Sequence, residues 1–275
     1  MFTFINKIED LEFLNRELVY KECIGVDTEF KRTSKDNMKL ALLQINDGEE
    51  IYLIDAIAIK NPEENVSFLF SKSVTKIFHS CKEDLEAIYA WTNKKMTNIF
   101  DTQIANAFLD GNFSISYQGL VEEMLGITLE KKETRSNWIR RPLTDSQLKY
   151  ASLDVEYLIY IYLEQKEQLS QSSKLKWLYQ DIERLISLTF DQISIPSDLK
   201  RTITKGQESA LLVDLNKLVE IVSKEEKINP TLLLSKKAQK EYLRLIFTKG
   251  LDQSLHYLTN WRQELLKKGL LNLLK

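Results

Sequence analysis

The 275-residue sequence is poor in the residues that bind zinc or form disulfides. It contains two cysteines, Cys23 and Cys81, and two histidines. Two cysteines are too few for a disulfide-stabilised scaffold or a cysteine-based zinc site. A metal site in this chain would therefore be built mainly from oxygen ligands, which suit Mg²⁺ or Mn²⁺.

The sequence also lacks long apolar runs. No run approaches the roughly 18 residues of a membrane-spanning helix, and the N-terminal stretch MFTFINKIEDLEFL reaches an acidic residue at position 9, unlike a signal peptide. A hydrophobic content of 43% and a charged content of 28% are typical of globular proteins. We therefore expect a cytoplasmic protein with no membrane partner.

Charge is distributed unevenly along the chain. Residues 1–165 carry 19 Lys and Arg against 27 Asp and Glu, and residues 166–275 carry 19 against 13, so the formal charges are −8 and +6. An acidic first part fits carboxylates gathered at a site, and a basic second part fits a polyanionic partner.

The first 110 residues alternate short β-type runs with helical patterns, which predicts an α/β fold. The expected strands are FTFI (2–5), CIGVDTEF (23–30), MKLALLQIND (38–47), EIYLIDA (50–56) and TKIFHS (75–80), with helices near 8–18 and 81–91. NDGEE at 46–50 is a turn signal, so one strand pair is expected to be an antiparallel hairpin in a mixed sheet.

From about residue 102 onward the periodicity is helical. Thr144 and Gln147 form a capping-box pattern that predicts a long helix over about 145–168. Breaks are expected at 172–174 and 194–206.

Several acidic residues have positions that suggest more than a surface role. Asp27 and Glu29 share one face of an otherwise apolar strand, so they need a cation, a shared proton or open water beside them. Asp84 lies early in a helix that follows a strand end, a place where α/β sheets commonly bind ligands. An acid at the start of a helix is also explained by its stabilisation of the helix dipole. Tyr150 and Asp154 are four apart on the long helix and face the same way, an arrangement that a simple hydrogen-bonded pair also explains.

Taken together, these segments resemble the ribonuclease D branch of the DEDD superfamily of 3′→5′ exonucleases. The likeness rests on VDTEF, HSCKEDLE and YASLDVEYL, with FDTQIANAFL, YQGLVEEMLGITLEK and RSNWIRRPLT between them, and it covers roughly residues 1–195. The resemblance implies a ribonuclease H-like mixed-sheet domain that binds two divalent ions, Mg²⁺ or Mn²⁺, because two-metal phosphodiester hydrolysis needs converging carboxylates.

The resemblance also implies roles for individual residues. Asp27 is expected to bridge both ions, Glu29 and Asp154 to complete the shell of one ion, and Asp84 to act mostly through water. Tyr150 is expected to orient the attacking water, since an ordinary tyrosine has a pKa near 10. The expected substrate contacts are Thr28, Phe30, His79, Asp101, Gln103, Arg135, Trp138, Arg140 and Arg141, each with packing, capping or solvated charge as the ordinary alternative.

Residues 196–275 are expected to form a small all-helical domain after an exonuclease domain at 1–195. Its helical pattern is similar to one divergent HRDC module, a nucleic-acid-binding domain found in ribonuclease D proteins. A bundle that only braces the nuclease is the alternative.

The function implied by the resemblance is removal of 3′-terminal nucleotides from RNA as 5′-monophosphates, with tRNA precursors as substrates. The sequence leaves the oligomeric state open, and a monomer is favoured. A DNA-directed exonuclease of the Werner type shares the core motifs, and the sequence shows no 2′-hydroxyl sensor that excludes it. An inactive RNA-binding module is the alternative from another class.

Overall fold

The computed structural model describes residues 2–34, 37–129, 133, 136–191, 199 and 202–274. Its strands are β1 (Phe2–Ile5), β2 (Cys23–Ser34), β3 (Asn37–Asn46), β4 (Ile51–Asp55), β5 (Thr75–Phe78) and β6 (Ile99–Asp101). Its helices are α1 (Ile8–Leu18), η1 (Ser67–Leu69), α2 (Lys82–Thr92), α3 (Thr102–Phe108), α4 (Tyr117–Leu125), α5 (Asp145–Glu156), α6 (Leu158–Gln171), α7 (Leu175–Phe190), α8 (Lys205–Glu226), α9 (Pro230–Leu234), α10 (Lys236–Lys249), α11 (Leu251–Leu255) and α12 (Asn260–Leu273).

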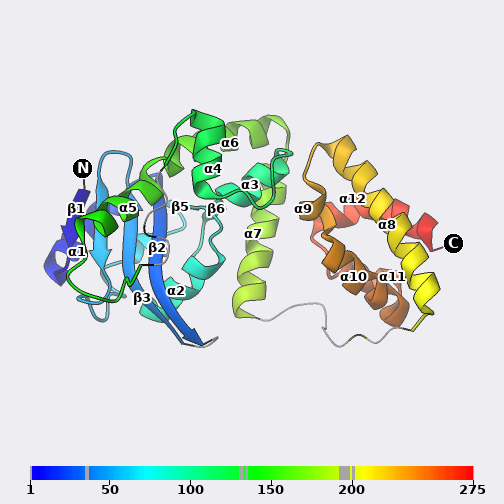
Figure 1. The fold of residues 1–275 in the computed structure, drawn as a ribbon, viewed down its shortest axis with the longest axis horizontal. Helices are drawn as coiled ribbons and strands as arrows, with labels where there is room; N and C mark the ends of the chain where they lie inside the picture. Colours follow the sequence, from blue (N-terminus) through cyan, green and yellow to red (C-terminus); the bar gives the residue numbers. More distant parts are fainter. Residues whose placement is uncertain are drawn as a thin grey trace. The chain divides into compact units, whose positions relative to one another are not determined.

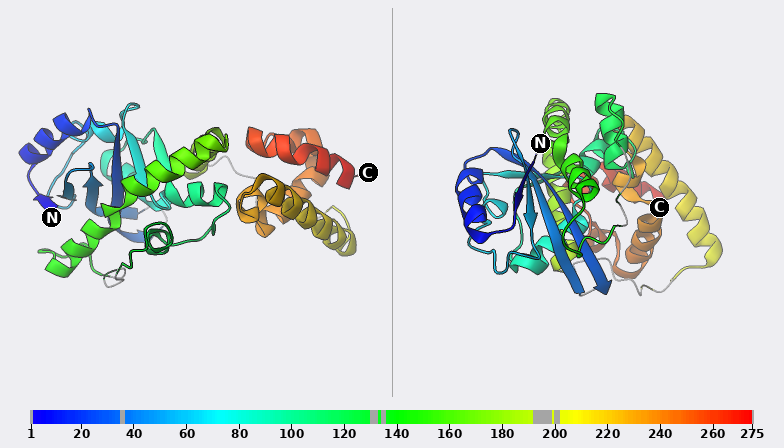
Figure 2. Two further views of the ribbon diagram at one scale, coloured as in Figure 1. Left: turned by 90° about the horizontal axis from the view of Figure 1, so that it is seen from above. Right: turned by 60° about the vertical axis from the view of Figure 1, so that its left-hand side comes forward.

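The strands form one six-stranded sheet in the order β1-β4-β3-β2-β5-β6 (Figure 1). β3 pairs antiparallel with both β2 and β4, and the remaining neighbours are parallel. β2 and β3 are the long pair that extends beyond the other strands (Figure 2). The mixed sheet and the hairpin that the sequence predicts between residues 38 and 56 are confirmed.

The centre of the sheet is a buried, mainly apolar layer. In β3, Leu40–Ile45 are all buried, and Ile24 and Val26 of β2 are inaccessible to solvent. Such continuous burial is the pattern of a strand covered on both faces, and here α2 and α5 both contact β2 and β3. β2 therefore lies in a part of the sheet that helices cover.

The structure differs from the sequence-based expectation in two elements. β6 is a strand of three residues that the sequence pattern does not predict, because so short a run carries little periodicity. The helix expected over 145–168 is two helices, α5 and α6, separated at Tyr157. The capping box at its start is present, with the Thr144 hydroxyl accepting from the Gln147 amide.

The chain divides into two compact units. Unit 1 is Met1–Gln103 with Ser114–Glu167, and unit 2 is Ile104–Phe113 with Gln168–Lys275. Unit 2 groups Ile104–Phe113 and α7 with the C-terminal helices, while the domains expected from the sequence, 1–195 and 196–275, stay a prediction.

Unit 2 has its own core, built around Trp261. That side chain is 1% exposed, stacks on Trp177 at 5.3 Å between ring centroids, and packs edge-on against Phe108. Its indole N–H donates to Asp181, which also pairs with Arg262.

Within the described part of the chain, no helix is both long and apolar enough to cross a membrane.

Candidate active site

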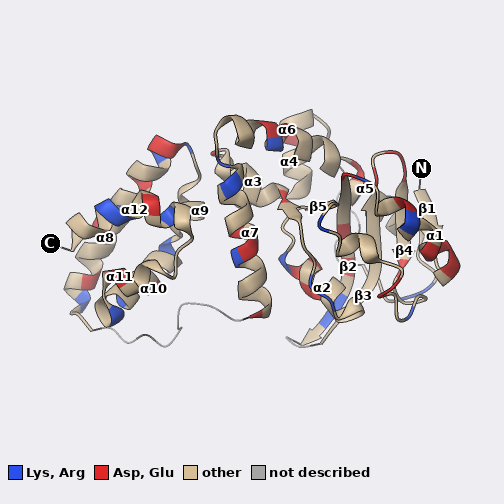
Figure 3. Ribbon diagram, turned by 180° about the vertical axis from the view of Figure 1, so that it is seen from behind, with Lys and Arg blue, Asp and Glu red and all other residues tan. Residues whose placement is uncertain are grey.

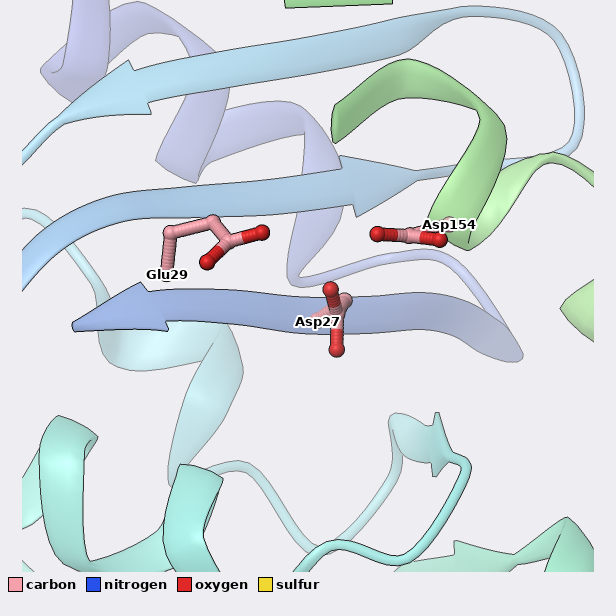
Figure 4. A group of neighbouring side chains, drawn as sticks. All are labelled: Asp27, Glu29 and Asp154. Atoms are coloured by element: carbon pink, nitrogen blue, oxygen red, sulfur yellow. The ribbon is translucent and has the colours of Figure 1, made fainter. Parts of the chain in front are cut away.

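Three carboxylates from β2 and α5 converge in unit 1. One oxygen from each of Asp27, Glu29 and Asp154 lies within 4.8 Å of the others. Figure 4 shows the carboxylates of Glu29 and Asp154 directed toward each other, with Asp27 beside them. Alternation along β2 puts Asp27 and Glu29 on one face. The sequence prediction that these acids gather at one place matches this geometry.

Asp154 is positioned by the junction between α5 and α6, at residues 155–158. The Asn46 side-chain amide donates to the carbonyls of Val155 and Glu156, at 3.0 Å each. These are carbonyls at the C-terminal end of α5, which lack partners within the helix. β3 therefore holds the last turn of the helix that carries Asp154.

Two further residues hold the same junction. The Tyr117 hydroxyl accepts the backbone N–H of Tyr157 at 3.0 Å. A Cβ on Gly25 would lie 3.1 Å from Leu158 Cβ and 3.3 Å from the Val155 carbonyl, so glycine permits this close approach of β2. Contacts from β2, β3 and α4 therefore fix the break between α5 and α6.

Tyr150 donates a side-chain hydrogen bond to Asp154, one helical turn away. The Tyr150 ring packs against Trp138 with 6.1 Å between ring centroids. Trp138 is 4% exposed, so its contact is with the tyrosine ring, in place of the expected substrate contact. The Tyr150 side chain is therefore oriented by its hydrogen bond to Asp154 and by its packing against Trp138.

Asp84 is close to the three acids but is held differently. It is buried in the first turn of α2, and its carboxylate accepts the Thr28 hydroxyl at 2.5 Å. The Thr28 side chain is itself buried, so its hydroxyl positions Asp84. The charge of Asp84 nevertheless raises the pKa of both Asp27 and Glu29.

Burial raises the pKa of every acid in this group, and repulsion by neighbouring acids of the group adds to it for Asp27 and Glu29. Burial is the largest cause in each case, and it raises the pKa of Glu29 to about 9 and those of Asp84 and Asp154 to about 7. The pKa of Asp27 is raised well above its ordinary value, first by burial and then by Asp84, Asp154 and Glu29. The Tyr150 hydrogen bond opposes this change in the pKa of Asp154.

This donor set fits divalent cations. Neighbouring carboxylates resist ionisation when no cation is bound beside them. They become stable as anions when a cation lies between them. Hard oxygen ligands of this kind suit Mg²⁺ or Mn²⁺.

The acids open into a cleft of about 230 Å³, which we call the carboxylate cleft. Its walls are Asp27, Glu29, His79, Tyr117, Gln118, Tyr150, Asp154 and Leu158. The sequence alone does not assign Tyr117, Gln118 or Leu158 to a site. YQGL is part of the family resemblance, and that is the available signal for the first two.

His79 and Gln103 share one partner. Both donate a side-chain N–H to the carbonyl of Ile115, at 2.9 and 2.8 Å. Burial lowers the pKa of His79, and its other ring nitrogen lies 2.9 Å from the Thr102 hydroxyl. His79 lines the cleft, while Gln103 holds the segment before α4.

Asp101 has its oxygens occupied by the protein backbone. It is 1% exposed and accepts from the N–H groups of Ser80, Cys81 and Gln103. It therefore caps the backbone of the turn between β5 and α2, and capping is one of the ordinary alternatives to a substrate contact named for it above.

Arg141 also differs from its expected role. Its five N–H donors all bond within the protein: two to Asp55 at 2.7 Å, and the others to the carbonyls of Trp138, Arg140 and Ala41. No donor is left for a phosphate, because this arginine anchors the segment before α5 to β3 and β4.

The remaining expected contacts are less constrained. Phe30 is half-buried next to a register shift in the β2–β3 pairing, and the Arg140 side chain is exposed. Arg135 lies outside the described residues.

The sheet and its acidic cleft define the class of protein. A family model described as a 3′-5′ exonuclease matches residues 2–170, and the chain belongs to this family.

Within that family the chain is similar to ribonuclease D, as the sequence motifs predict. It is 36% identical to the Escherichia coli protein over 185 residues, 66% of this chain and 48% of the relative. It is 37% identical to the Pseudomonas paraeruginosa protein over 205 residues, 73% of this chain and 54% of the relative. The chain thus spans about half the length of the curated relatives it matches.

A solved structure of Escherichia coli RNase D resembles the fold with a TM-score of 0.66 and 28% identity. The match covers 99% of this chain and 74% of that chain. That protein is described as an exoribonuclease involved in structured RNA processing.

Proposed function

We propose that this protein is a metal-dependent 3′→5′ exoribonuclease that releases nucleoside 5′-monophosphates. The observation that carries the proposal is the convergence of Asp27, Glu29 and Asp154 in an open cleft, with Tyr150 bonded to Asp154. RNA as the substrate is supported by the relatives named ribonuclease D, and tRNA precursors are the substrates we expect.

Asp27, Glu29 and Asp154 would hold two divalent ions, with Asp84 nearby. When bound, such ions supply the positive charge that activates water and stabilises the leaving 3′-oxygen. The carboxylates themselves fix where that charge lies, because β2 and the α5–α6 junction are both anchored.

Tyr150 positions the attacking water. Its O–H is donated to Asp154, and a hydroxyl that donates one hydrogen bond can also accept one from water. The water's own lone pair is thereby turned toward the phosphorus. A tyrosine ordinarily has a pKa of about 10, so orientation suits it better than proton abstraction.

We further propose that the helices after residue 195 contribute to RNA binding through exposed basic residues. Lys205, Lys236 and Lys240 are exposed. Arg244, a further basic residue of these helices, pairs with Glu208 at 2.6 Å and is a weaker candidate. Lys200 and Arg201, two further basic residues of this segment, lie outside the described residues.

The test uses one RNA labelled in turn at its 3′ and 5′ ends, incubated with and without Mg²⁺ or Mn²⁺. We expect immediate release of labelled mononucleotide from the 3′ end and stepwise shortening of the 5′-labelled strand. Internal cleavage, or cleavage that survives chelation, would contradict the proposal. A DNA strand of the same sequence separates the RNA-directed enzyme from the Werner-type alternative.

The contribution of the C-terminal helices is tested with Lys236→Glu/Lys240→Glu. Phosphate contacts release counterions, so this variant should show a higher KM and a shallower salt dependence with unchanged kcat. Unchanged KM and salt dependence would leave these helices as a brace.

A further inference from the structure

A second hollow of unit 1 shares no residue with the carboxylate cleft. It has a volume of about 370 Å³ and lies between β1, the adjoining end of β4, and one face of α1. We call it the edge hollow. Asp10, Phe13 and Glu17 of α1 line it at helical spacing, facing Thr3 and Phe4 of β1.

β1 is the edge strand of the sheet. Its one neighbour among the described strands is β4, so its other side presents backbone N–H and C=O groups that no described strand pairs. Such an edge is a template for another extended chain. At four residues the strand is short, but it is as long as β5, which pairs on both sides.

Aromatic side chains are exposed at this edge. Phe13 is 65% exposed and Phe4 is 36% exposed. The buried face of α1 is supplied by Leu11, Leu14 and Leu18, so Phe13 is not needed to close the core. Two exposed phenylalanines beside an open edge mark a contact surface rather than a packing need.

The charges in the edge hollow are acidic. Asp10, Glu17 and Glu50 line it, no Lys or Arg is among its described lining residues, and Figure 3 shows acidic positions in red on α1. Burial raises the pKa of Tyr52, in the wall of the hollow, to about 12, with further contributions from Asp47, Glu50 and Glu17. Two acids of the hollow, Glu50 and Glu17, therefore act electrostatically on the Tyr52 hydroxyl.

Two of the basic side chains near the edge hollow already have acidic partners, whereas Lys7, between β1 and α1, is exposed to solvent. Arg16 pairs with Glu12, and Lys21 pairs with Asp47 and Glu49. Glu50 accepts a hydrogen bond from the Thr3 hydroxyl at 2.5 Å, while Asp10 and Glu17 are exposed and open to positive charge from outside the molecule.

We propose that the edge hollow docks an extended, basic segment of a partner protein, which adds beside β1 as a further strand. Backbone pairing with β1 holds the segment, Lys or Arg side chains meet the three carboxylates, and an apolar side chain covers Phe13. A second copy of this chain is the wrong occupant, because pairing two β1 edges would bring two sets of the same carboxylates together.

The test measures fluorescence anisotropy of a labelled peptide, Lys-Phe-Lys-Val-Lys-Val, titrated with the full chain. Two comparison peptides have either Glu in place of each Lys or N-methyl groups at alternate backbone nitrogens, which blocks pairing along one edge. We expect each comparison peptide to bind at least about tenfold more weakly. Equal binding of either one would overturn strand addition by a basic segment.

The matched variants are Asp10→Lys/Glu17→Lys and Glu9→Lys/Glu12→Lys, which change the net charge of α1 equally. The first pair lies in the edge hollow and the second pair does not. We expect the first variant to weaken peptide binding by about tenfold or more and the second by less than about twofold. Equal effects would reduce the interaction to general charge attraction and overturn the proposal.

Hydrogen exchange of residues 3–5 provides the structural readout. The peptide should slow exchange of β1 amides in the wild-type chain, and nuclease activity should be the same in both variants. Binding without protection of β1, or a dimer at sedimentation equilibrium in the absence of peptide, would also overturn the proposal.

Discussion

Two groups of three acidic residues in unit 1 contrast the interior of the sheet with its edge. Asp27, Glu29 and Asp154 are half-buried or more, around the central strand β2, whereas Asp10, Glu17 and Glu50 are exposed around the edge strand β1. The two groups contain the same number of carboxylates but differ in their exposure to solvent. Enclosed carboxylates need compact cations close by, while exposed ones keep their hydration and attract cations carried on flexible side chains such as lysine.

The largest expected effect comes from changing the central acid. Asp27→Asn removes the anion that three neighbours surround, so we expect kcat to fall by about 1000-fold or more, corresponding to several kcal/mol of lost charge stabilisation. Labelled-RNA degradation measures it. Glu17→Gln, the same kind of change in the edge hollow, should leave kcat unaltered. Substantial activity in Asp27→Asn would show that the site is misplaced.

Tyr150 and Asp154 separate positioning from metal binding. Tyr150→Phe should lower kcat by about 10- to 1000-fold, the range for loss of an orienting or proton-transfer group, and keep its metal affinity. Asp154→Asn should lose both, because it removes an anion from the cluster. Calorimetric titration with Mn²⁺ measures the affinity. Wild-type affinity in Asp154→Asn would contradict its assignment as a ligand.

The raised pKa values give the metal-free protein a defined pH dependence. A carboxyl group whose folded pKa lies above its ordinary value contributes stability below about pH 4, and that stability is lost as pH rises through the folded pKa. For Asp84 and Asp154 this pKa is about 7 and for Glu29 about 9. The free energy of unfolding should therefore fall as the pH rises from about 4 to about 9. Urea denaturation at a series of pH values, with a chelator present, measures this fall.

Metal addition should reverse this loss. The increase in Tm on adding Mn²⁺ should therefore be greater at about pH 8.5 than at about pH 5.5, where protonated carboxyls compete with the ion. Differential scanning fluorimetry measures it, with Asp27→Asn as the control that loses most of the increment. An increment independent of pH would mean that these carboxyls do not bind the ion.

The smallest effect we expect is at the α5–α6 junction. Asn46→Ala leaves the carbonyls of Val155 and Glu156 without their side-chain donor, which should cost about 1–3 kcal/mol of unfolding free energy. Because the same contacts hold Asp154, Mn²⁺ affinity should fall as well. Urea denaturation and calorimetry measure the two. A loss of stability with unchanged metal affinity would make Asn46 a structural residue only.

Much of this architecture follows from local sequence pattern. The alternation of β-type runs with helical periodicity predicts the strands of unit 1 up to residue 78, and NDGEE predicts the β3–β4 hairpin. Thr144 and Gln147 predict the start of α5, because a capping box needs only neighbours within one turn. The pairing of Tyr150 with Asp154 follows from helical spacing in the same way.

Only the tertiary structure decides which polar groups remain free. Arg141 stands in a motif that suggests phosphate binding, yet its donors are consumed by Asp55 on β4 and by backbone carbonyls, 86 positions away in the case of Asp55. Tyr117 and Asn46 reach the α5–α6 junction from distant segments, and Tyr157 breaks a helix that periodicity alone continues. Sequence determined the chemical groups and their local spacing. Long-range packing decided their partners and their access to solvent, because hydrogen bonds and burial depend on what the fold brings beside each side chain.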